Sequence, residues 1–423
     1  MKLYLESLGC DKNRVDAEKL LFELLQKYPG SSVTDEPSEA EIAIVNTCSF
    51  IGPAKEESIQ CILDLAQYKE TGKLEKLIVA GCLVERYKDE IRKELPEIDE
   101  ITSVKDYVKR LDHQMARVES GEKHSRYLKI AEGCDKYCSY CIIPRLRGHY
   151  RSIPKELVLE EARALVSEGA GELILVAQET TLYGTDLYKK KALAELLAEL
   201  SEIPNLQWIR ILYCYPEEIE PELIREMKRN PKVCHYLDLP IQHASDRILK
   251  RMNRRTRKEE LKEKIALLRK EMPDIALRTT IITGFPGETE EDFQEVLDFI
   301  SEMRFDRLGA FPYSQEEGTK AAEMEDQIPE KLKNQRLSQI MELQQNIAFR
   351  KAEEQIGRKL KVLVCGYDEE EQRVLCRSYM DAPDVDSYLY VFGEKKEAGS
   401  FLYAKVVDTE GYDLIGEWCE STE

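Results

Sequence analysis

Short apolar runs alternate with longer amphipathic segments over the first hundred residues. Runs at residues 2–8, 41–47 and 76–80 predict strands. Apolar positions spaced three and four apart predict helices at 15–28, 54–68 and 85–94. Strands that alternate with helices are typical of a parallel, doubly wound sheet. We therefore expect an N-terminal α/β domain over residues 1–118.

The same alternation continues through the middle of the chain. Strands are predicted at 126–131, 172–178, 208–213, 236–239, 277–283 and 307–313, with helices at 155–168, 191–201, 216–228, 257–271 and 290–303. Six such units make an incomplete, TIM-like (βα)6 barrel, whose functional residues lie at the carboxyl ends of the strands. A charged helix at 329–355 then ends this second domain, residues 119–356.

The last part of the chain changes to a period of two. Polar and apolar residues alternate at 359–364, 373–377, 388–392 and 401–408, which predicts a small all-β barrel over residues 357–423. Eight Lys and Arg against fifteen Asp and Glu give this region a net charge of −7. A barrel of this size that gripped RNA phosphates should be basic, so the charge disfavours RNA as its ligand.

Composition indicates a large cytoplasmic enzyme. Of the 423 residues, 34% are charged and 42% hydrophobic, which is typical of globular proteins. The N-terminus does not resemble a secretory signal, and no apolar run is long enough to span a membrane. In a reducing compartment, the 12 cysteines favour metal binding over disulfides. The net charge of −19 disfavours non-specific nucleic-acid binding and suits a basic partner.

Three cysteines in one short loop give the strongest chemical signal. Cys134, Cys138 and Cys141 have the spacing C-x3-C-x2-C, directly after the predicted strand at 126–131. Three thiolates at this spacing suit an iron–sulfur cluster that keeps one iron without a protein ligand. An open coordination position is where a metal site performs chemistry. The alternative is a structural zinc knot, which normally needs a fourth ligand, and the nearest candidate is His149.

A second set of cysteines is dispersed in sequence but shares one structural position. Cys10, Cys48 and Cys82 each come just after one of the three predicted strands of the N-terminal domain. In parallel sheets, ligands bind outside the carboxyl ends of the strands. We therefore expect these three thiols to meet at one edge of the sheet and to hold a second cluster, again with one open iron.

Four residues near strand ends are candidate cofactor contacts. Gly284 and Gly287 form a turn after the predicted strand at 277–283, and such a turn lets backbone approach a ligand closely. Gln178 and Gln242 lie at or just after strand ends. These two side chains either hydrogen-bond a cofactor or only satisfy the backbone of their loops.

The C-x3-C-x2-C loop resembles the signature of radical S-adenosylmethionine (SAM) enzymes, in which an aromatic residue before the last cysteine, here Tyr140, is part of the pattern. Over the whole chain, the order of the three domains resembles the methylthiotransferases, with a TRAM-like final barrel. The stretch SLGCDKN around Cys10 resembles their RimO branch, as do the segments 236–245, 308–311 and 382–386. The tRNA-modifying MiaB branch typically carries a TFGCQMN-like stretch instead.

This resemblance implies two 4Fe–4S clusters, one on each set of cysteines, together with SAM. The cluster of the C-x3-C-x2-C loop would reduce SAM and release a 5′-deoxyadenosyl radical, which takes a hydrogen atom from the β-carbon of an aspartate in ribosomal protein S-twelve. The other cluster would present a methylated sulfur. An electron donor is then a further partner. Arg147 and Arg151 resemble a basic loop shared by both branches, whose alternative role is to neutralise nearby sulfides.

Two other functions stay open at this point. One is a tRNA methylthiotransferase that modifies an adenosine by the same chemistry, which the acidic final barrel disfavours. The other is a non-catalytic iron–sulfur scaffold, which has no need of an open iron. If the substrate is a basic ribosomal protein, Asp384 and Asp386 of the final barrel are candidate substrate contacts, because opposite charges steer association.

Overall fold

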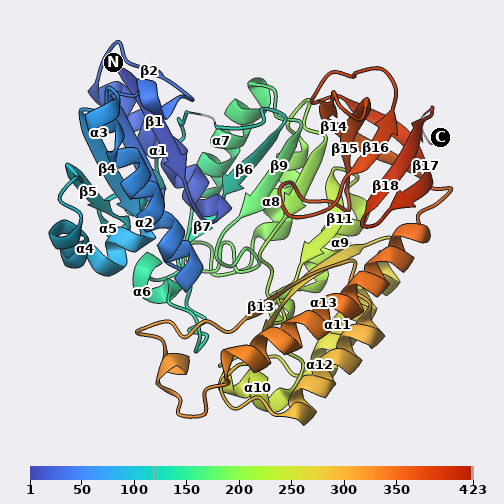
Figure 1. Cartoon of the computed structure of the whole chain (residues 1–423). Helices are drawn as coiled ribbons and strands as arrows, with labels where there is room; N and C mark the ends of the chain where they lie inside the picture. Colours follow the sequence, from blue (N-terminus) through green and yellow to red (C-terminus); the bar gives the residue numbers. More distant parts are fainter. Residues whose placement is uncertain (119, 421–423) are drawn as a thin grey trace.

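The computed structural model describes residues 1–118 and 120–420. These residues form three main sheets (Figure 1). The first sheet has five parallel strands in the order β2-β1-β3-β4-β5. Its strands are β1 (Lys2–Ser7), β2 (Ser32–Val33), β3 (Ile42–Thr47), β4 (Lys76–Gly81) and β5 (Glu100–Ser103). The parallel sheet confirms the α/β prediction, and β2 and β5 are additions to the three strands expected.

Helices cover both faces of this first sheet. Because side chains alternate along a strand, Ile42 and Ile44 pack with α1 on one face, while Ala43 and Val45 pack with α2 and α4 on the other. This arrangement makes the sheet doubly wound, as expected. The helices of the domain are α1 (Asp11–Lys27), η1 (Pro37–Glu39), α2 (Gly52–Ala66), α3 (Tyr68–Thr71), α4 (Cys82–Glu94) and α5 (Val104–Leu111).

Six parallel strands form the open central barrel, in the order β13-β12-β11-β10-β9-β6. They are β6 (Ser125–Lys129), β9 (Glu172–Val176), β10 (Trp208–Ile211), β11 (Val233–Asp238), β12 (Ala276–Thr283) and β13 (Arg307–Pro312). The order confirms the (βα)6 prediction. The major helices that pack on its outer face are α7 (Lys155–Ser167), α8 (Leu193–Ser201), α9 (Pro221–Arg229), α11 (Lys258–Glu271) and α12 (Glu290–Met303).

The central domain also contains several short elements and one long helix. Two short strands pair antiparallel around the first cysteine loop, β7 (Ala131–Glu132) and β8 (Arg151–Ser152). The long helix α13 (Glu330–Glu353) runs back along the molecule towards the last domain (Figure 1). The remaining helices are α6 (Ile143–Arg147), η2 (Pro216–Glu218), α10 (Asp246–Arg251) and η3 (Lys320–Glu323).

The last domain is a closed five-stranded barrel in the order β14-β15-β16-β18-β17. Its strands are β14 (Lys359–Asp368), β15 (Arg373–Ser378), β16 (Leu389–Phe392), β17 (Phe401–Glu410) and β18 (Asp413–Trp418). The sequence predicted a barrel but only four of these strands. It missed β18, which pairs with β16 in parallel and with β17 antiparallel and so closes the barrel.

This small barrel packs against the inner face of the central sheet, near the starts of its strands. Trp208, Tyr236 and Ala276 share one apolar cluster with Val362 and Leu389 of the small barrel. Buried charges cross the same contact. Glu172 accepts hydrogen bonds from Arg210 at 2.8 Å and from Arg377 at 2.6 Å, and all three side chains are almost fully buried. The small barrel therefore closes the base of the open barrel and leaves the opposite end free for a site.

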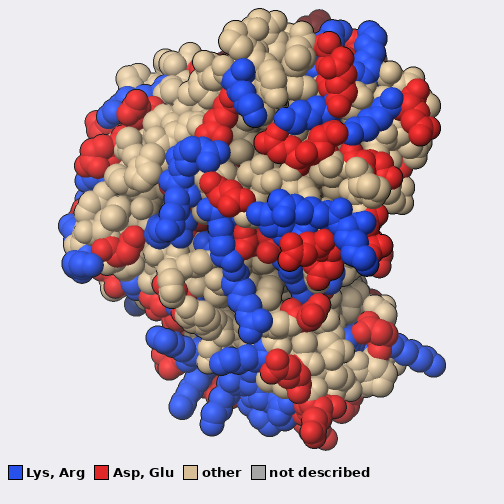
Figure 2. All heavy atoms as spheres, turned by 90° about the vertical axis from the view of Figure 1, so that its left-hand side faces the viewer, with Lys and Arg blue, Asp and Glu red and all other residues tan. Residues whose placement is uncertain are grey.

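On the face shown in Figure 2, the charges do not form one continuous acidic surface. Figure 2 shows Lys and Arg interspersed with Asp and Glu over the face that contains the N-terminal domain, with basic side chains gathered at the lower end of the molecule in this view. In the described ranges, no helix has the length and apolar character needed to cross a membrane.

Candidate active site

The first cysteine loop lies at the carboxyl end of β6, directly after β7. Cys134 and Cys138 are buried, and Cys141 is partly buried. The preceding Gly133 has a φ of +81°, and a Cβ there would lie 2.2 Å from the carbonyl oxygen of His149, so only glycine lets the loop pass this close. Burial raises the pKa of the Cys134 thiol to about 11. Without a metal this thiol is protonated, so metal binding must release its proton.

The three dispersed cysteines converge at the carboxyl edge of the N-terminal sheet. Cys10 precedes α1, Cys48 follows β3, and Cys82 is the first residue of α4. The loop of Cys10 is pressed against Cys48, since a Cβ on Gly9 (φ +86°) would lie 2.8 Å from the Cys48 sulfur. Burial raises the pKa of Cys82 to about 12, with smaller upward contributions from the charges of Cys10 and Cys48 and an opposing one from Arg147. The three thiols are thus electrostatic neighbours.

The spacing of the sulfur atoms does not suit a single metal ion. Ligands of one tetrahedral zinc lie roughly 4 Å apart, because each Zn–S bond is about 2.3 Å long. In the described part of the chain, only Glu122, His124 and Cys365 bring three ligand atoms within 4.8 Å of one another. Neither cysteine triplet does so. A cluster tolerates wider spacing because each thiolate binds a different iron, so both donor sets fit the iron–sulfur interpretation better than a zinc knot.

One short segment after β10 reaches both cysteine sets. The hydroxyl oxygen of Tyr215 lies 3.3 Å from the sulfur of Cys138. Two residues earlier, the Tyr213 hydroxyl donates to Asp11 at 2.9 Å, and Asp11 is next to Cys10. Tyr213 has a φ of +60°, a costly conformation for a residue with a large side chain. The two cysteine sets therefore face each other across the end of β10.

A buried ionic network also joins the two sets. The Arg147 guanidinium donates to Asp16 at 2.5 Å and to Glu132 at 3.2 Å, and it lies 3.7 Å from the sulfur of Cys82. Lys129 donates to the same two carboxylates, at 2.5 and 3.0 Å. Burial by itself raises the pKa of Glu132, but Arg147 and Lys129 outweigh it and bring this pKa down to about 2. The positive charge of Arg147 thus offsets the negative charge of the two carboxylates and also lies beside the sulfur of Cys82.

Arg151 has a smaller part in this network. It is partly exposed and contacts Asp112 at 3.4 Å, at the edge of the buried charges. Of the two arginines in the basic loop, only Arg147 lies beside a cysteine of the site.

Two of the predicted cofactor contacts, Tyr140 and Gln178, lie at the first cysteine loop. Tyr140 packs on the apolar cluster of Met252, Phe285 and Tyr313. Gln178 donates to Glu132 at 2.7 Å, while its side-chain oxygen is buried without a hydrogen-bond partner. Such an orphaned acceptor suits a donor group on a bound cofactor. Gln242 has a φ of +70° and forms an isolated parallel bridge with Ile281 of β12.

The glycine turn is used mainly for packing. The Gly284 amide donates to Glu288 at 2.9 Å, and that of Gly287 donates to the carbonyl of Asp326 at 2.8 Å. A Cβ on Gly284 would lie 2.3 Å from the Lys333 side chain of α13. Both amides therefore have internal partners, and the close approach that this turn permits is to α13.

The two acidic candidates of the small barrel differ sharply in exposure. The Asp384 side chain is 70% exposed and lies 3.9 Å from Arg14. The Asp386 side chain is 1% exposed and accepts hydrogen bonds from Tyr236 at 2.7 Å and from the Ala382 amide at 2.9 Å. Asp386 therefore ties the small barrel to the central sheet, and only Asp384 is accessible to a partner.

Sequence reasoning missed several residues that the fold brings to the site. Arg254 stacks over the ring of Tyr215 at 4.1 Å and donates to the carbonyl of Pro240. Tyr213 and Tyr215 follow a strand end directly, so the strand-end rule could have singled them out. Nothing local in the sequence marks Arg254.

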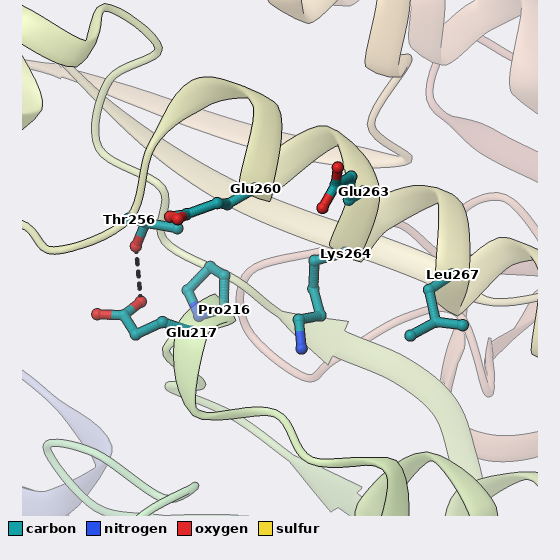
Figure 3. A pocket seen from close by; sticks show the side chains of 7 residues that line it. All are labelled: Pro216, Glu217, Thr256, Glu260, Glu263, Lys264 and Leu267. Carbon is teal, nitrogen blue, oxygen red and sulfur yellow. Dashed lines mark hydrogen bonds between the residues drawn. The ribbon is translucent and has the colours of Figure 1, made fainter.

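A pocket of about 430 Å³ lies between η2 and α11, and no cysteine lines it (Figure 3). Its polar wall includes a hydrogen bond from the Thr256 hydroxyl to Glu217 at 2.8 Å. Since this pocket contains no cysteine, it is not where we expect the clusters.

Three family models match successive parts of the chain. Residues 2–103 match the Uncharacterized protein family UPF0004, residues 128–300 the Radical SAM superfamily, and residues 356–419 the TRAM domain. This order follows the order of the three sheets along the chain.

Curated relatives match over nearly the full length. The chain is 52% identical to a protein of Lachnoclostridium phytofermentans named Ribosomal protein uS12 methylthiotransferase RimO, over 98% of this chain and 99% of the relative. It is 47% identical to the protein of the same name from Desulfitobacterium hafniense, over 98% of each. These matches confirm the resemblance drawn from the sequence.

Solved structures show a related fold at low sequence identity. The radical SAM methyltransferase TsrM from Kitasatospora setae, with cobalamin and a 4Fe–4S cluster bound, has a TM-score of 0.55 at 12% identity, over 74% of each chain. The cobalamin-dependent radical enzyme OxsB has a TM-score of 0.52 at 14% identity, over 82% of this chain and 56% of that one. At these identities the likeness concerns the fold alone.

Proposed function

The chain belongs to the RimO family of ribosomal protein uS12 methylthiotransferases within the radical SAM superfamily, and we propose that it adds a methylthio group to the β-carbon of an aspartate in uS12. As a radical SAM enzyme of this family it uses SAM and two 4Fe–4S clusters. We assign the SAM-binding cluster to Cys134, Cys138 and Cys141, and the second cluster to Cys10, Cys48 and Cys82.

The observation that carries this proposal is the segment from Tyr213 to Tyr215. It contacts Cys138 at one end and the neighbour of Cys10 at the other, so one substrate carbon can approach both cysteine sets. When bound, the clusters and SAM supply the radical chemistry and the sulfur, which no side-chain acid or base could replace at an unactivated carbon. The protein contributes position, charge balance and exclusion of water.

The residues around the site fit these tasks. Arg147 places a fixed positive charge beside Cys82, which stabilises a thiolate and a negatively charged cluster. Tyr215 places a hydroxyl beside Cys138, where a hydrogen bond to sulfur tunes cluster electronics. Arg254 keeps a buried positive charge over Tyr215, on the side where the anionic part of SAM is expected. The unpartnered oxygen of Gln178 is a further candidate SAM contact, together with Tyr140 and Gln242.

We divide the chain at the connections between the three sheets, into residues 1–118, 119–356 and 357–423. The N-terminal domain would bind the cluster of Cys10, Cys48 and Cys82, and the central domain would bind SAM. The last division closes the base of the central barrel, and its exposed Asp384 is available to a basic protein. Its net charge of −7 is unfavourable for polyanionic tRNA. An electron donor must also dock, and we place the reaction in the cytoplasm, where ribosomal proteins are made and assembled.

Product analysis tests the function directly. The reconstituted enzyme, SAM and a reductant are incubated with a uS12 peptide that contains the target aspartate, or with tRNA that carries the modified adenosine. We expect a methylthio adduct on the peptide by mass spectrometry and unchanged nucleosides in the tRNA. Cys48→Ala is the matched control and should leave the peptide unmodified. Methylthiolated adenosine with an untouched aspartate would instead assign the tRNA function.

A further inference from the structure

Lys12 is a largely buried lysine whose ammonium lacks a carboxylate partner among the described residues and keeps some contact with solvent. It is the second residue of α1 and is 5% exposed. The other three buried lysines, Lys19, Lys129 and Lys333, each form an ion pair with a glutamate or aspartate within 3.0 Å. Within the described residues, no carboxylate oxygen lies within 4.0 Å of the Lys12 Nζ. The Lys12 Nζ instead lies over the ring of Tyr213, whose centroid is 3.1 Å away.

This environment is unusual because burying a charge without a partner is costly. The face of an aromatic ring offsets part of that cost for a cation. Asp11 is adjacent in sequence, but its carboxylate accepts from the Tyr213 hydroxyl and lies beyond ion-pair distance of Lys12. The ammonium is therefore held in place and still has the capacity to bind an anion.

The position of Lys12 links it to the proposed reaction. It lies two residues after Cys10 in the sequence. Its aromatic neighbour Tyr213 lies two residues before Tyr215, whose hydroxyl contacts Cys138. Lys12 therefore contacts the segment that reaches both cysteine sets, close to where the substrate carbon has to be held.

We propose that Lys12 binds the side-chain carboxylate of the substrate aspartate and so selects aspartate over its neutral analogues. This inference rests on the proposed function. The β-carbon of aspartate is bonded to the carboxylate carbon, so an ion pair to the carboxylate fixes the position of the reacting carbon. An asparagine would leave this ammonium without an anion in a site that the bound peptide closes off from water, and a site built for a charged partner rejects analogues that lack it.

The alternative is that Lys12 only anchors Tyr213 and packs the N-terminal domain against the barrel. The two roles differ in one measurable respect. A packing role affects every ligand equally, whereas a carboxylate contact distinguishes an aspartate peptide from the same peptide with asparagine.

The test measures binding of these two fluorescent uS12 peptides to the anaerobically reconstituted enzyme by anisotropy. We expect wild type to prefer the aspartate peptide by about tenfold to a hundredfold, as for a hydrogen bond to a charged group. Lys12→Met should bind both peptides equally, at the affinity of wild type for the asparagine peptide. Lys12→Arg should keep most of the preference. Iron content measured on each sample reports whether both clusters are loaded.

Lys27→Met is the matched control, because Lys27 is an exposed lysine at the other end of α1 that also lies over a tyrosine ring. It should keep the full preference. The inference is overturned if Lys12→Met weakens both peptides by the same factor, or if wild type does not distinguish them. The wild-type comparison needs no variant, so it decides even if Lys12→Met does not fold. If the enzyme modifies tRNA and neither peptide, the proposed function is wrong. If the enzyme modifies the aspartate peptide and Lys12→Met still prefers that peptide over the asparagine peptide, only the inference about Lys12 is wrong.

Discussion

Replacing Arg147 with methionine should destabilise the protein far more than replacing an exposed arginine. The Arg147 side chain is 2% exposed and shares the carboxylates of Asp16 and Glu132 with Lys129. Asp112 pairs with Lys129 at 3.3 Å and with Arg151 at 3.4 Å, so three positive and three negative charges balance in the whole network. The substitution leaves it with a net charge of −1 in a buried position. Removing one partner of a buried ion pair typically costs about 3–5 kcal/mol, and we expect a loss of this size.

Arg110, an exposed arginine of the neighbouring N-terminal domain, provides the control. It is 54% exposed and forms two hydrogen bonds of 2.7 Å to Glu23. Exposed ion pairs contribute roughly 0.2–1 kcal/mol, so Arg110→Met should be nearly neutral. Unfolding in guanidinium chloride, followed by tryptophan fluorescence, separates the two. The free energy of unfolding falls by several kcal/mol for each molar of guanidinium chloride, so the unfolding midpoint of Arg147→Met should be lower than that of wild type by about 1 M.

The assay also tests the link between Arg147 and the second cysteine set. Because the guanidinium lies beside the sulfur of Cys82, Arg147→Met should lose iron to a chelator faster than Arg110→Met. Arg147→Lys keeps the positive charge but loses the planar guanidinium that binds two carboxylates at once. We therefore expect its unfolding midpoint and its rate of iron loss to lie between those of wild type and Arg147→Met. If the midpoints of Arg147→Met and Arg110→Met agree within error, the buried network is not a source of stability and this reasoning is wrong.

Four other outcomes follow from the site and the domain contacts. Reconstituted wild type should bind about eight irons, and Cys134→Ala about half as many, by colorimetric iron assay. Cys138→Ala should abolish SAM cleavage to 5′-deoxyadenosine by chromatography, whereas Cys48→Ala should retain some cleavage without methylthiolated product. Arg377 and Arg210 outweigh burial and lower the pKa of Glu172 to about 2, so its charge stabilises the fold above the ordinary glutamate pKa near pH 4.3. The excess stability of wild type over Glu172→Gln, from denaturation midpoints, should then shrink between about pH 4.5 and 2. Binding of uS12 should weaken with salt, and Asp384→Lys should reduce the association rate at low salt in stopped-flow experiments.

Much of the fold is predictable because it follows from local periodicity. The alternating strands and helices of the first two domains indicate parallel sheets, and parallel sheets bring strand ends together. The convergence of Cys10, Cys48 and Cys82 could therefore be expected without coordinates. The strand β18 was missed because Asp413–Trp418 is short and only half apolar, and its pairing with β16 is set by barrel closure.

The side chains that complete the site are harder to predict, since their positions depend on contacts between distant segments. Lys12 and Tyr213 are about two hundred residues apart and meet only when two domains pack. Asp386 illustrates the opposite case. Its position in an acidic loop suggested a surface charge, but Tyr236 and Arg278 of the central sheet enclose it. Sequence patterns report which residues are polar, and they do not report which domain covers them.

The apolar cluster between the two barrels has a consequence for biosynthesis. Trp208 and Tyr236 are translated long before Val362 and Leu389, with which they share a core. Contacts so distant along the chain form late and slowly. Until the ribosome has made the final domain, the inner face of the central sheet stays uncovered, with buried charges such as Arg210 lacking part of their environment. A chain truncated before β14 should therefore be a target for chaperones and proteases.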